Sequence, residues 1–476
     1  MNRILVTGAN GFIGSHLVAL LVKEKKADDE IVCMVRNTSD LSNILEFVKV
    51  PGVSVIIGDV TKPDTLPNAV RGATYIFHLG AALKIPEDSR YFAVNTRGTE
   101  NMLKAALEHA AGTLKRFLFV SSEAAAGPSP GKVAVDEERE RKPVCAYGRS
   151  KLEAEKIAAG YMDKLPITIV RPSAVYGARE KDLTQTIPAV ERHIHPKIGF
   201  TKSYASFVNA ADLVKGMVAA AKSEKAVGQT YFLTNKDFYS DIQLVKTIAK
   251  AMGRPFGIPM PIPKFALVIF SLLSTLKYWF FRGRPAMALN MVINITQKYW
   301  ICSPAKAKRD FGWESEISIE AGMKQTLDNY REKRRQVKLM PDESNTLIWA
   351  KYFFLTLIIA AIVEGSSVIA GFFYYQPWWM ILPIILVLWV GILGLVAMIS
   401  RGFSSEIQFI ITFIVAFVLT YLDFRFTHIK HLPGGKLFGV GNTIWITVIL
   451  AASAGVLVVI INALMRAFYK RKLRIG

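Results

Sequence analysis

"RILVTGANGFIGSHLVALLV", from Arg3 to Val22, decides the fold of the N-terminal part of the chain. A short apolar run leads into a glycine-rich turn, and the residues after the turn carry apolar side chains at helical spacing. Glycines in such a unit keep the turn tight and let a pyrophosphate approach the backbone, while the helix N-terminus faces the negative charge. The stretch therefore predicts a dinucleotide site, with contacts from Gly8, Asn10, Gly11, Phe12, Ile13 and Gly14.

The second predicted strand, "EIVCMVRNTSD" from Glu30 to Asp40, ends on a basic residue. An acidic side chain at this place would bind the ribose 2'-hydroxyl of NAD, whereas Arg36 suits the 2'-phosphate of NADP. We therefore expect NADP(H) as the cofactor. NAD(H) stays the alternative, because Arg36 can also be a solvated strand end.

Four more strand-like runs follow and alternate with helical patterns. Ligands of open parallel sheets bind at the carboxyl ends of the strands. Asp59 and Val60, which end "VIIGDV", are placed to meet the adenine, and Gly80 and Ala81 are small enough to let the cofactor pass. The alternation predicts an α/β fold with a Rossmann-type doubly wound parallel sheet over residues 1–175.

A tyrosine and a lysine lie four residues apart in "CAYGRSKLEAE", from Cys145 to Glu155. In a helix, Tyr147 and Lys151 share one face. A cation beside a phenol stabilises the phenolate and lowers its pKa, which would make Tyr147 a usable proton donor. Taken alone, the two residues can also be an ordinary surface pair.

Several motifs occur together in an order typical of one enzyme family. They are the glycine turn, "GDV" from Gly58, "NTRGTENML" from Asn95, "VSS" from Val120, "YGRSK" from Tyr147 and "RPSAVYG" from Arg171. Up to about Arg335, the chain resembles the extended short-chain dehydrogenase/reductases, the NAD-dependent epimerase/dehydratase family. The stretch "SPAKAKRDFGWESEISIEAGMKQTL" is similar to the end of the 3β-hydroxysteroid dehydrogenase and dihydroflavonol reductase branch.

The resemblance implies that Ser122, Tyr147 and Lys151 are the catalytic residues. Ser122 would hydrogen-bond the substrate oxygen and Tyr147 would be the general acid/base. Lys151 would lower the pKa of Tyr147 and hold the nicotinamide ribose. A carbonyl held by two hydroxyls can accept hydride at carbon while Tyr147 protonates its oxygen. Ser121 is expected to serve packing or backbone bonding at the strand end, and Asn95 to tie a helix to a strand.

The substrate is expected to bind to residues 176–340, which include the apolar helix "PKFALVIFSLLSTLKYWFFR" at 263–282. Because charges flank this helix, we expect it to lie in the bilayer surface or to cover an oily pocket, with a buried core helix as the alternative. Steroid-type members are similarly apolar in this region. Many sugar-nucleotide enzymes have an arginine in the segment before Phe207, where this chain has Ser206.

These features favour an NADP(H)-dependent oxidoreductase that acts on a ketone or secondary alcohol of a lipid, sterol-like or isoprenoid molecule. Two alternatives remain open. One is a nucleotide-sugar epimerase or dehydratase, because the same family contains these enzymes. The other is a non-catalytic, nucleotide-binding membrane scaffold, against which the intact serine, tyrosine and lysine set argues.

From Leu347 onward the chain consists of long apolar runs separated by short polar loops, which predicts an all-α transmembrane domain at 347–468. Four runs are long enough for the roughly 20 residues that cross a bilayer core. They are Tyr352–Phe373, Trp378–Ile399, Ile407–Phe424 and Thr443–Ala467. Basic flanks predict that both ends are cytoplasmic, although the basic loop at 425–436 does not fit this topology. Glu364, inside the first run, is expected either to be functional or to hydrogen-bond another span.

The net charge of +21 is compatible with nucleic-acid binding, but no zinc-ligand spacing, recognition helix or aromatic-interleaved basic motif accompanies it. Attraction to anionic lipid headgroups is the simpler explanation. The three cysteines have no metal-ligand spacing and are interpreted as reduced cytosolic thiols. We therefore expect a multi-pass membrane protein with a cytoplasmic catalytic domain that binds membrane lipids and a small lipophilic substrate, without nucleic acid or metal. A homodimer is left open.

Overall fold

The structure, a computed structural model, describes residues 1–83, 85, 87–180, 186–254, 257–281 and 287–339. Residues 1–335 form one compact unit. The predicted transmembrane domain at 347–468, its four spans and Glu364 lie outside the described residues. Among the helices that the structure describes, none combines the length and the hydropathy needed to cross a bilayer.

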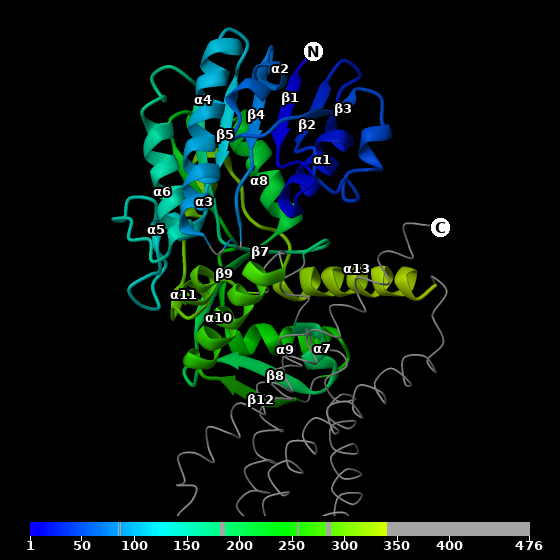
Figure 1. The fold of residues 1–476 in the computed structure, drawn as a ribbon, viewed down its shortest axis with the longest axis vertical. Coiled ribbons are helices and arrows are strands. Elements are labelled where there is room, and N and C mark those ends of the chain that lie inside the picture. The colour runs from blue at the N-terminus through cyan, green and yellow to red at the C-terminus, as the bar shows by residue number, and fades with distance from the viewer. Residues whose placement is uncertain (84, 86, 181–185, 255–256, 282–286, 340–476) are drawn as a thin grey trace, which may run out of the picture. The chain divides into compact units, whose positions relative to one another are not determined.

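Seven parallel strands form the central sheet, in the order β10-β6-β5-β4-β1-β2-β3 (Figure 1). The strands are β1 (Arg3–Thr7), β2 (Glu30–Val35), β3 (Val53–Ile57), β4 (Tyr75–His78), β5 (Arg116–Val120), β6 (Ile167–Pro172) and β10 (Thr230–Leu233). The order runs outward from β1 in both directions, which is the doubly wound arrangement. The predicted Rossmann-type sheet is therefore confirmed.

Helices cover both faces of this sheet (Figure 1). One face carries α1 (Phe12–Glu24) and α8 (Ala210–Lys222); the other carries α2 (Pro67–Val70), α4 (Gly98–His109) and α6 (Ala146–Ala159). Successive residues of β1 point to opposite faces, so that Val6 packs with α1 and α8 while Leu5 packs under α2 and α4. Because the central strands are buried on both faces, they appear in the sequence as continuous apolar runs.

The seventh strand, β10, was not predicted, and it extends the first domain beyond residue 175. It pairs with β6 at the edge of the sheet. Its Tyr231 is buried against Phe311, with ring centroids 4.9 Å apart, and that contact recruits α12 (Ala305–Phe311) to the same core. The nucleotide-binding part therefore includes β10 and α12, although both lie within the range 176–340 that was expected to bind the substrate.

The smaller, substrate-side part contains two further sheets (Figure 1). In the first, β9 (Tyr204–Asn209) pairs with β7 (Ala174–Tyr176), β11 (Phe238–Ser240) and β13 (Tyr299–Trp300). In the second, β8 (Ile194–Ile198) pairs in parallel with β12 (Ile258–Ile262). Its helices are α7 (Ile187–Glu191), α9 (Asp241–Ala251), α10 (Lys264–Phe281), α11 (Leu289–Ile295) and α13 (Ile319–Leu339). The predicted apolar helix at 263–282 is therefore confirmed as α10.

Short helical segments connect these elements. They are α3 (Asp88–Tyr91), the π-helical turn η3 (Phe92–Arg97), α5 (Glu123–Ala126), and the 3₁₀ turns η1 (Phe47–Lys49), η2 (Pro63–Thr65) and η5 (Glu224–Ala226).

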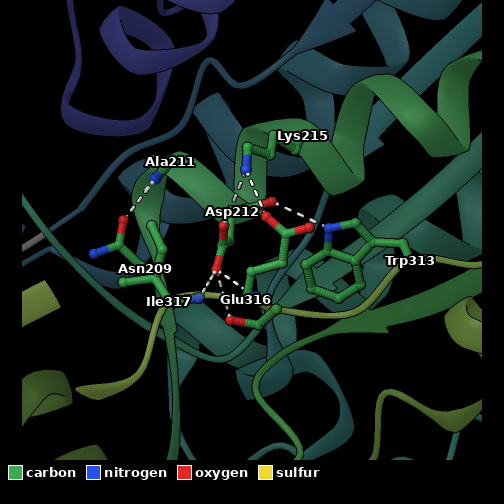
Figure 2. A network of polar contacts seen from close by, with 8 residues as sticks. Asn209, Ala211, Asp212, Lys215, Trp313, Glu316 and Ile317 are labelled. Carbon is green, nitrogen blue, oxygen red and sulfur yellow. Dashed lines mark hydrogen bonds and ion pairs between the residues drawn. The ribbon is translucent and has the colours of Figure 1, made fainter. Parts of the chain in front are cut away.

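One buried carboxylate, Asp212, fastens the chain before α13 to the first turn of α8 (Figure 2). Its Oδ2 accepts hydrogen bonds from the backbone N–H groups of Glu316 (2.8 Å) and Ile317 (2.7 Å). The Ser315 hydroxyl donates to the same oxygen at 2.9 Å, and the Trp313 indole N–H donates to the Asp212 carbonyl at 3.2 Å. A carboxylate at this place also faces the positive end of the helix dipole. One anion therefore joins α8 to the last part of the unit.

Asp212→Ala removes the acceptor of two part-buried N–H groups and the Ser315 hydroxyl, so we expect it to lower the free energy of unfolding by about 3 kcal/mol. Asp212→Asn keeps one acceptor oxygen and should cost less. Thermal unfolding of the intact chain in detergent measures both. The control Lys222→Gln removes an exposed ion pair with Glu24 (3.4 Å) and should have little effect. Equal unfolding temperatures for Asp212→Ala and the control would contradict this role.

Candidate active site

The glycine turn after β1 brings backbone segments unusually close together. Gly8 has φ = 66°, which side-chain-bearing residues rarely adopt. A Cβ on Gly14 would lie 2.2 Å from the Gly8 carbonyl oxygen, so α1 can approach β1 only with glycine at that position. Helix α1 follows Gly11, and no side chain among the described residues caps it. The N–H groups of its first turn, including those of Phe12 and Ile13, therefore suit a pyrophosphate.

Thr7 and His78, which the sequence analysis did not single out, position the loop beside this turn. The Thr7 hydroxyl accepts from the Gly80 backbone N–H at 2.9 Å and pairs with Nδ1 of His78 at 2.9 Å. Burial lowers the pKa of His78 to about 3, so its ring is neutral and serves as a hydrogen-bonding spacer. Gly80 thereby lies against Gly8, with Ala81 next along the chain, as the cofactor path requires.

Arg36, Asp59 and Val60 lie where β2 and β3 end. Arg36 is exposed one residue beyond β2. Partial burial acts to raise the pKa of Asp59, but hydrogen bonds from Thr61 and the charge of Arg36 outweigh it and lower that pKa. Val60 is buried against Gly98, where an added Cβ would come within 2.7 Å of it. The structure thus brings these three residues to one edge of the sheet.

Two asparagines hold backbone segments in place around the turn. The Asn10 amide donates to the Asp40 carbonyl oxygen at 3.1 Å, so its side chain braces the loop after β2. Asn95 is buried, accepts from the Ala82 N–H at 2.7 Å and donates to the Ser150 hydroxyl at 3.0 Å. It joins the loop after β4 to α6, and the expected structural role of Asn95 is confirmed.

Ser122, Tyr147 and Lys151 come together where β5 ends and α6 begins. The Ser122 hydroxyl accepts from the Ala124 N–H at 3.2 Å and is hydrogen-bonded to the Tyr147 phenol. The buried Lys151 ammonium donates to the Val120 carbonyl oxygen at 2.8 Å. Two hydroxyls that can hold one substrate oxygen therefore lie next to each other, with a cation one turn further along α6.

The pKa of Tyr147 moves in the direction opposite to the expected one. Burial raises it to about 12, and the hydrogen bond with Ser122 offsets only part of this rise. The predicted lowering by Lys151 is wrong for the polypeptide alone, because the ammonium is directed to a β5 carbonyl and burial lowers its own pKa to about 8. At neutral pH Tyr147 is therefore a protonated phenol, which is the form a proton donor needs.

A buried carboxylate that the sequence analysis missed, Glu155, braces the catalytic helix. It lies one turn after Lys151 in α6 and accepts from the Ser121 hydroxyl at 2.6 Å. The Arg171 guanidinium of β6 donates to both of its oxygens, at 2.9 and 2.7 Å. Its charge also raises the pKa of Lys151 against the larger effect of burial. Ser121 is buried at the strand end and its N–H donates to the Val170 carbonyl oxygen, as expected, but its hydroxyl also bonds to a side chain.

Glu123, the residue after Ser122, is a second buried carboxyl that the sequence analysis missed. Burial raises its pKa to about 8, although hydrogen bonds from the Cys302 thiol and the Ala174 backbone N–H act in the opposite direction. The sulfur lies 3.8 Å from Oε2 of Glu123. A neutral acid group therefore adjoins the catalytic serine, and its position directly after "VSS" was the available signal.

Helix α11 connects the substrate-side part to the start of the catalytic helix. Asn290 accepts from the Ala146 N–H at 2.8 Å and donates to the Asp88 carboxylate at 2.6 Å. The Cys145 thiol donates to the Asn294 side-chain oxygen at 3.2 Å. Because α10 packs against α11, the apolar helix is mechanically linked to the residues that position Tyr147.

Comparison with known proteins shows what the chain is similar to. Residues 4–233 match the NAD dependent epimerase/dehydratase family. The chain is 26% identical to UDP-glucose 4-epimerase of Vibrio cholerae, over 69% of this chain and 95% of that protein. It is 24% identical to 3beta-hydroxysteroid-dehydrogenase/decarboxylase isoform 1 of Arabidopsis thaliana, over 74% of this chain and 85% of the relative.

A solved structure shares the fold. It is UDP-glucuronic acid 4-epimerase from Bacillus cereus in complex with UDP-glucuronic acid and NAD, with a TM-score of 0.57 and 21% identity over 70% of this chain and 99% of that one. Together with the glycine turn and the serine, tyrosine and lysine set, these matches indicate an NAD-dependent enzyme that is similar, over residues 4–233, to the NAD dependent epimerase/dehydratase family.

Proposed function

We propose that this enzyme transfers hydride between NADP(H) and a ketone or secondary alcohol of a lipophilic molecule, such as a lipid, a sterol-like or an isoprenoid compound. One observation carries the proposal. Asn290 of α11 bonds to the first turn of the catalytic helix, and α11 in turn carries the apolar α10. The hydroxyl pair of Ser122 and Tyr147 is thereby coupled to an oily structural element.

Each residue of the site has a separate role in the proposed reaction. Ser122 and Tyr147 hold the substrate oxygen, and in the reducing direction the Tyr147 phenol gives its proton to that oxygen. In this proposal the Lys151 ammonium, which donates to the Val120 carbonyl oxygen in the polypeptide alone, binds the nicotinamide ribose when the cofactor is present. When bound, the nicotinamide supplies or accepts the hydride. Because Glu123 is neutral, it does not add a second negative charge beside the phenolate that forms on Tyr147.

Arg36 supports NADP(H) over NAD(H). Its guanidinium is exposed beyond β2, where it can reach a 2'-phosphate, and it already exerts an electrostatic effect on Asp59 at the same edge. A phosphate would add a stronger, charge-assisted partner for this guanidinium.

The membrane location is part of the same proposal. The four apolar runs between 347 and 468 and the basic segments that flank them support a multi-pass anchor with the catalytic part in the cytoplasm. A lipid-embedded anchor would keep the enzyme close to a substrate that partitions into the bilayer. A homodimer stays a prediction.

The similarity to UDP-sugar epimerases favours a second candidate, a nucleotide-sugar epimerase or dehydratase. Ser206 stands where many sugar-nucleotide enzymes have an arginine, and the lipid hypothesis uses this difference. Its hydroxyl is buried and accepts from the Cys302 N–H at 3.2 Å, so that it joins β9 to the chain after β13. Such an enzyme would return the hydride to its own substrate, so it would consume no cofactor. The similarity to enzymes and the intact set of Ser122, Tyr147 and Lys151 argue against the scaffold hypothesis.

Tyr147→Phe should abolish reduction of lipophilic ketones, with a loss of at least about 100-fold in kcat, because the proton donor is removed. Cofactor affinity should stay within a few-fold. Purified protein in detergent, a panel of lipid ketones and NADPH absorbance provide the measurement. Tyr161→Phe, in the turn that follows α6, is the matched control and should be fully active. Activity that survives in Tyr147→Phe would end this mechanism, and turnover of UDP-sugars without cofactor consumption would favour the alternative.

The ammonium of Lys151 should make activity depend on pH. Because its pKa is lowered to about 8, its charge is present below that pH and is lost as the pH rises through it. We expect kcat/KM for the cofactor to fall about tenfold per unit above this pH. Glu155→Gln removes a charge that raises this pKa, so the fall should begin at lower pH. Glu153→Gln, on the exposed face of α6, should leave the profile unchanged. An identical profile for both variants would refute the role of Glu155.

NADPH should outcompete NADH about tenfold to a hundredfold, because a charge-assisted bond between Arg36 and a 2'-phosphate is worth roughly 1.5 to 3 kcal/mol. Arg36→Asp should reverse the preference, since a carboxylate repels the phosphate but accepts from the ribose hydroxyls. Competition binding with both nucleotides tests this. If the unmodified protein binds both equally and Arg36→Asp changes neither affinity, Arg36 is only a solvated strand end.

A further inference from the structure

Helix α10 exposes a stripe of apolar side chains. The stripe consists of Phe265, Val268, Ile269 and Leu272, and Phe265 is 67% exposed while Leu272 is 52% exposed. Its buried face carries Leu267 together with Ser271 and Ser274. A helix that packs on a protein core in water usually has polar side chains on its outward face. The outward face of α10 therefore suits a surrounding more apolar than water.

The stripe continues onto the strand that leads into α10. Ile258 and Met260 of β12 are exposed, and β12 ends two residues before α10 begins. In Figure 1, β8, β12 and α10 lie toward the end of the unit that is remote from β3. We call these six side chains the outer apolar patch: Ile258, Met260, Phe265, Val268, Ile269 and Leu272. Single exposed apolar residues are common in proteins, but several of them on segments that follow each other directly in the chain indicate a site of association.

Phe200, in the loop between β8 and β9, belongs to the same end of the unit and is 74% exposed. The Lys197 ammonium donates to its carbonyl oxygen at 2.8 Å, and the preceding Gly199 lies beside Lys264 at the start of α10. Aromatic and lysine side chains therefore stand together at the border of the patch, as they do at the interfacial level of membranes.

The sequence around the patch carries positive charge only. No Asp or Glu occurs between Asp241 and Asp310, a stretch that contains all of β12, α10 and α11. The basic residues in the stretch are Lys246, Lys250, Arg254, Lys264, Lys277, Arg282, Arg284, Lys298, Lys306, Lys308 and Arg309. An apolar surface on a stretch of chain whose charges are all basic complements a bilayer with anionic headgroups, whereas protein interfaces usually carry charges of both signs around the apolar centre.

We propose that the outer apolar patch inserts into the surface of an anionic bilayer, with α10 lying in the plane of the interface. Lys264 and Lys197 then face the headgroups. Since α11 joins α10 to the first turn of the catalytic helix through Asn290, the inserted helix brings the site to the membrane surface and lets a substrate enter from the lipid side. This deepens the proposed function, and it rests on that function only for the direction of substrate entry.

Fluorescent labels at single introduced cysteines test the insertion in the intact chain. The three native cysteines are buried, so a label at Ile269→Cys or at Ile57→Cys is selective. Ile269 is 51% exposed and Ile57, on β3, is 55% exposed, which makes the second site a matched control. The protein is reconstituted into vesicles of phosphatidylcholine and phosphatidylglycerol. Quenching by spin-labelled lipid and by aqueous iodide is then measured at both sites.

We expect the label at 269 to be quenched several-fold more by the lipid probe than the label at 57, and to be protected from iodide. Lys264→Glu in the 269-labelled protein should weaken the lipid quenching, as should vesicles of phosphatidylcholine alone. Quenching by iodide at 269 equal to that at 57 would overturn the proposal. Protection from iodide without lipid quenching would also overturn it, because another protein surface, such as a second copy of this chain, would then cover the patch.

Activity measurements distinguish a failure of the membrane insertion from a failure of the proposed function. If the label at 269 behaves as expected but no lipid ketone is turned over, the substrate assignment fails and the insertion stands. If lipid ketones are turned over while the label at 269 remains open to iodide, the insertion fails alone. Replacing Phe265, Ile269 and Leu272 together by serine should raise the KM for a vesicle-bound ketone several-fold and leave that for a short, water-soluble ketone unchanged.

Discussion

The buried carboxylate of Glu155 is the constraint on which the catalytic geometry depends. A charge removed from water must be paired and hydrogen-bonded, and Glu155 obtains this from Arg171 of β6 and Ser121 at the end of β5. Ser121 adjoins Ser122, and Glu155 lies one turn from Lys151. The same anion thus fixes the relative positions of β5, β6 and α6, and supports the positive charge of Lys151 as well.

The parts of the site around Glu155 are held in place by different kinds of interaction. The glycine turn is fixed by backbone approach, because a Cβ at Gly14 would meet the Gly8 carbonyl at 2.2 Å. The loop that carries Gly80 is fixed by the neutral His78 and Thr7 pair. On the substrate side, only a few side-chain bonds, with Asn290 at their centre, join α11 to α6.

Much of the fold could be predicted from local sequence, and the missing parts share one physical cause. Six strands of the sheet, the glycine turn and α10 follow from hydropathy and glycine spacing within about 20 residues. Three features depend on contacts between separate elements, and no local sequence pattern indicates such contacts. They are the seventh strand β10, the Glu155–Arg171 pair and the Asn290 contact. The pKa of Tyr147 was predicted in the wrong direction, because residue spacing indicates a neighbouring charge but not the depth of burial.

The most direct test of the central claim follows the hydride. Membranes that contain the protein, supplied with NADPH carrying deuterium at the transferable position of C4, can be extracted and analysed by mass spectrometry. The account predicts a hydroxy-lipid that gains one deuterium in the presence of the unmodified protein and not with Tyr147→Phe. Deuterium that never reaches the lipid fraction, together with a nucleotide sugar that changes configuration without net oxidation of NADPH, would contradict it.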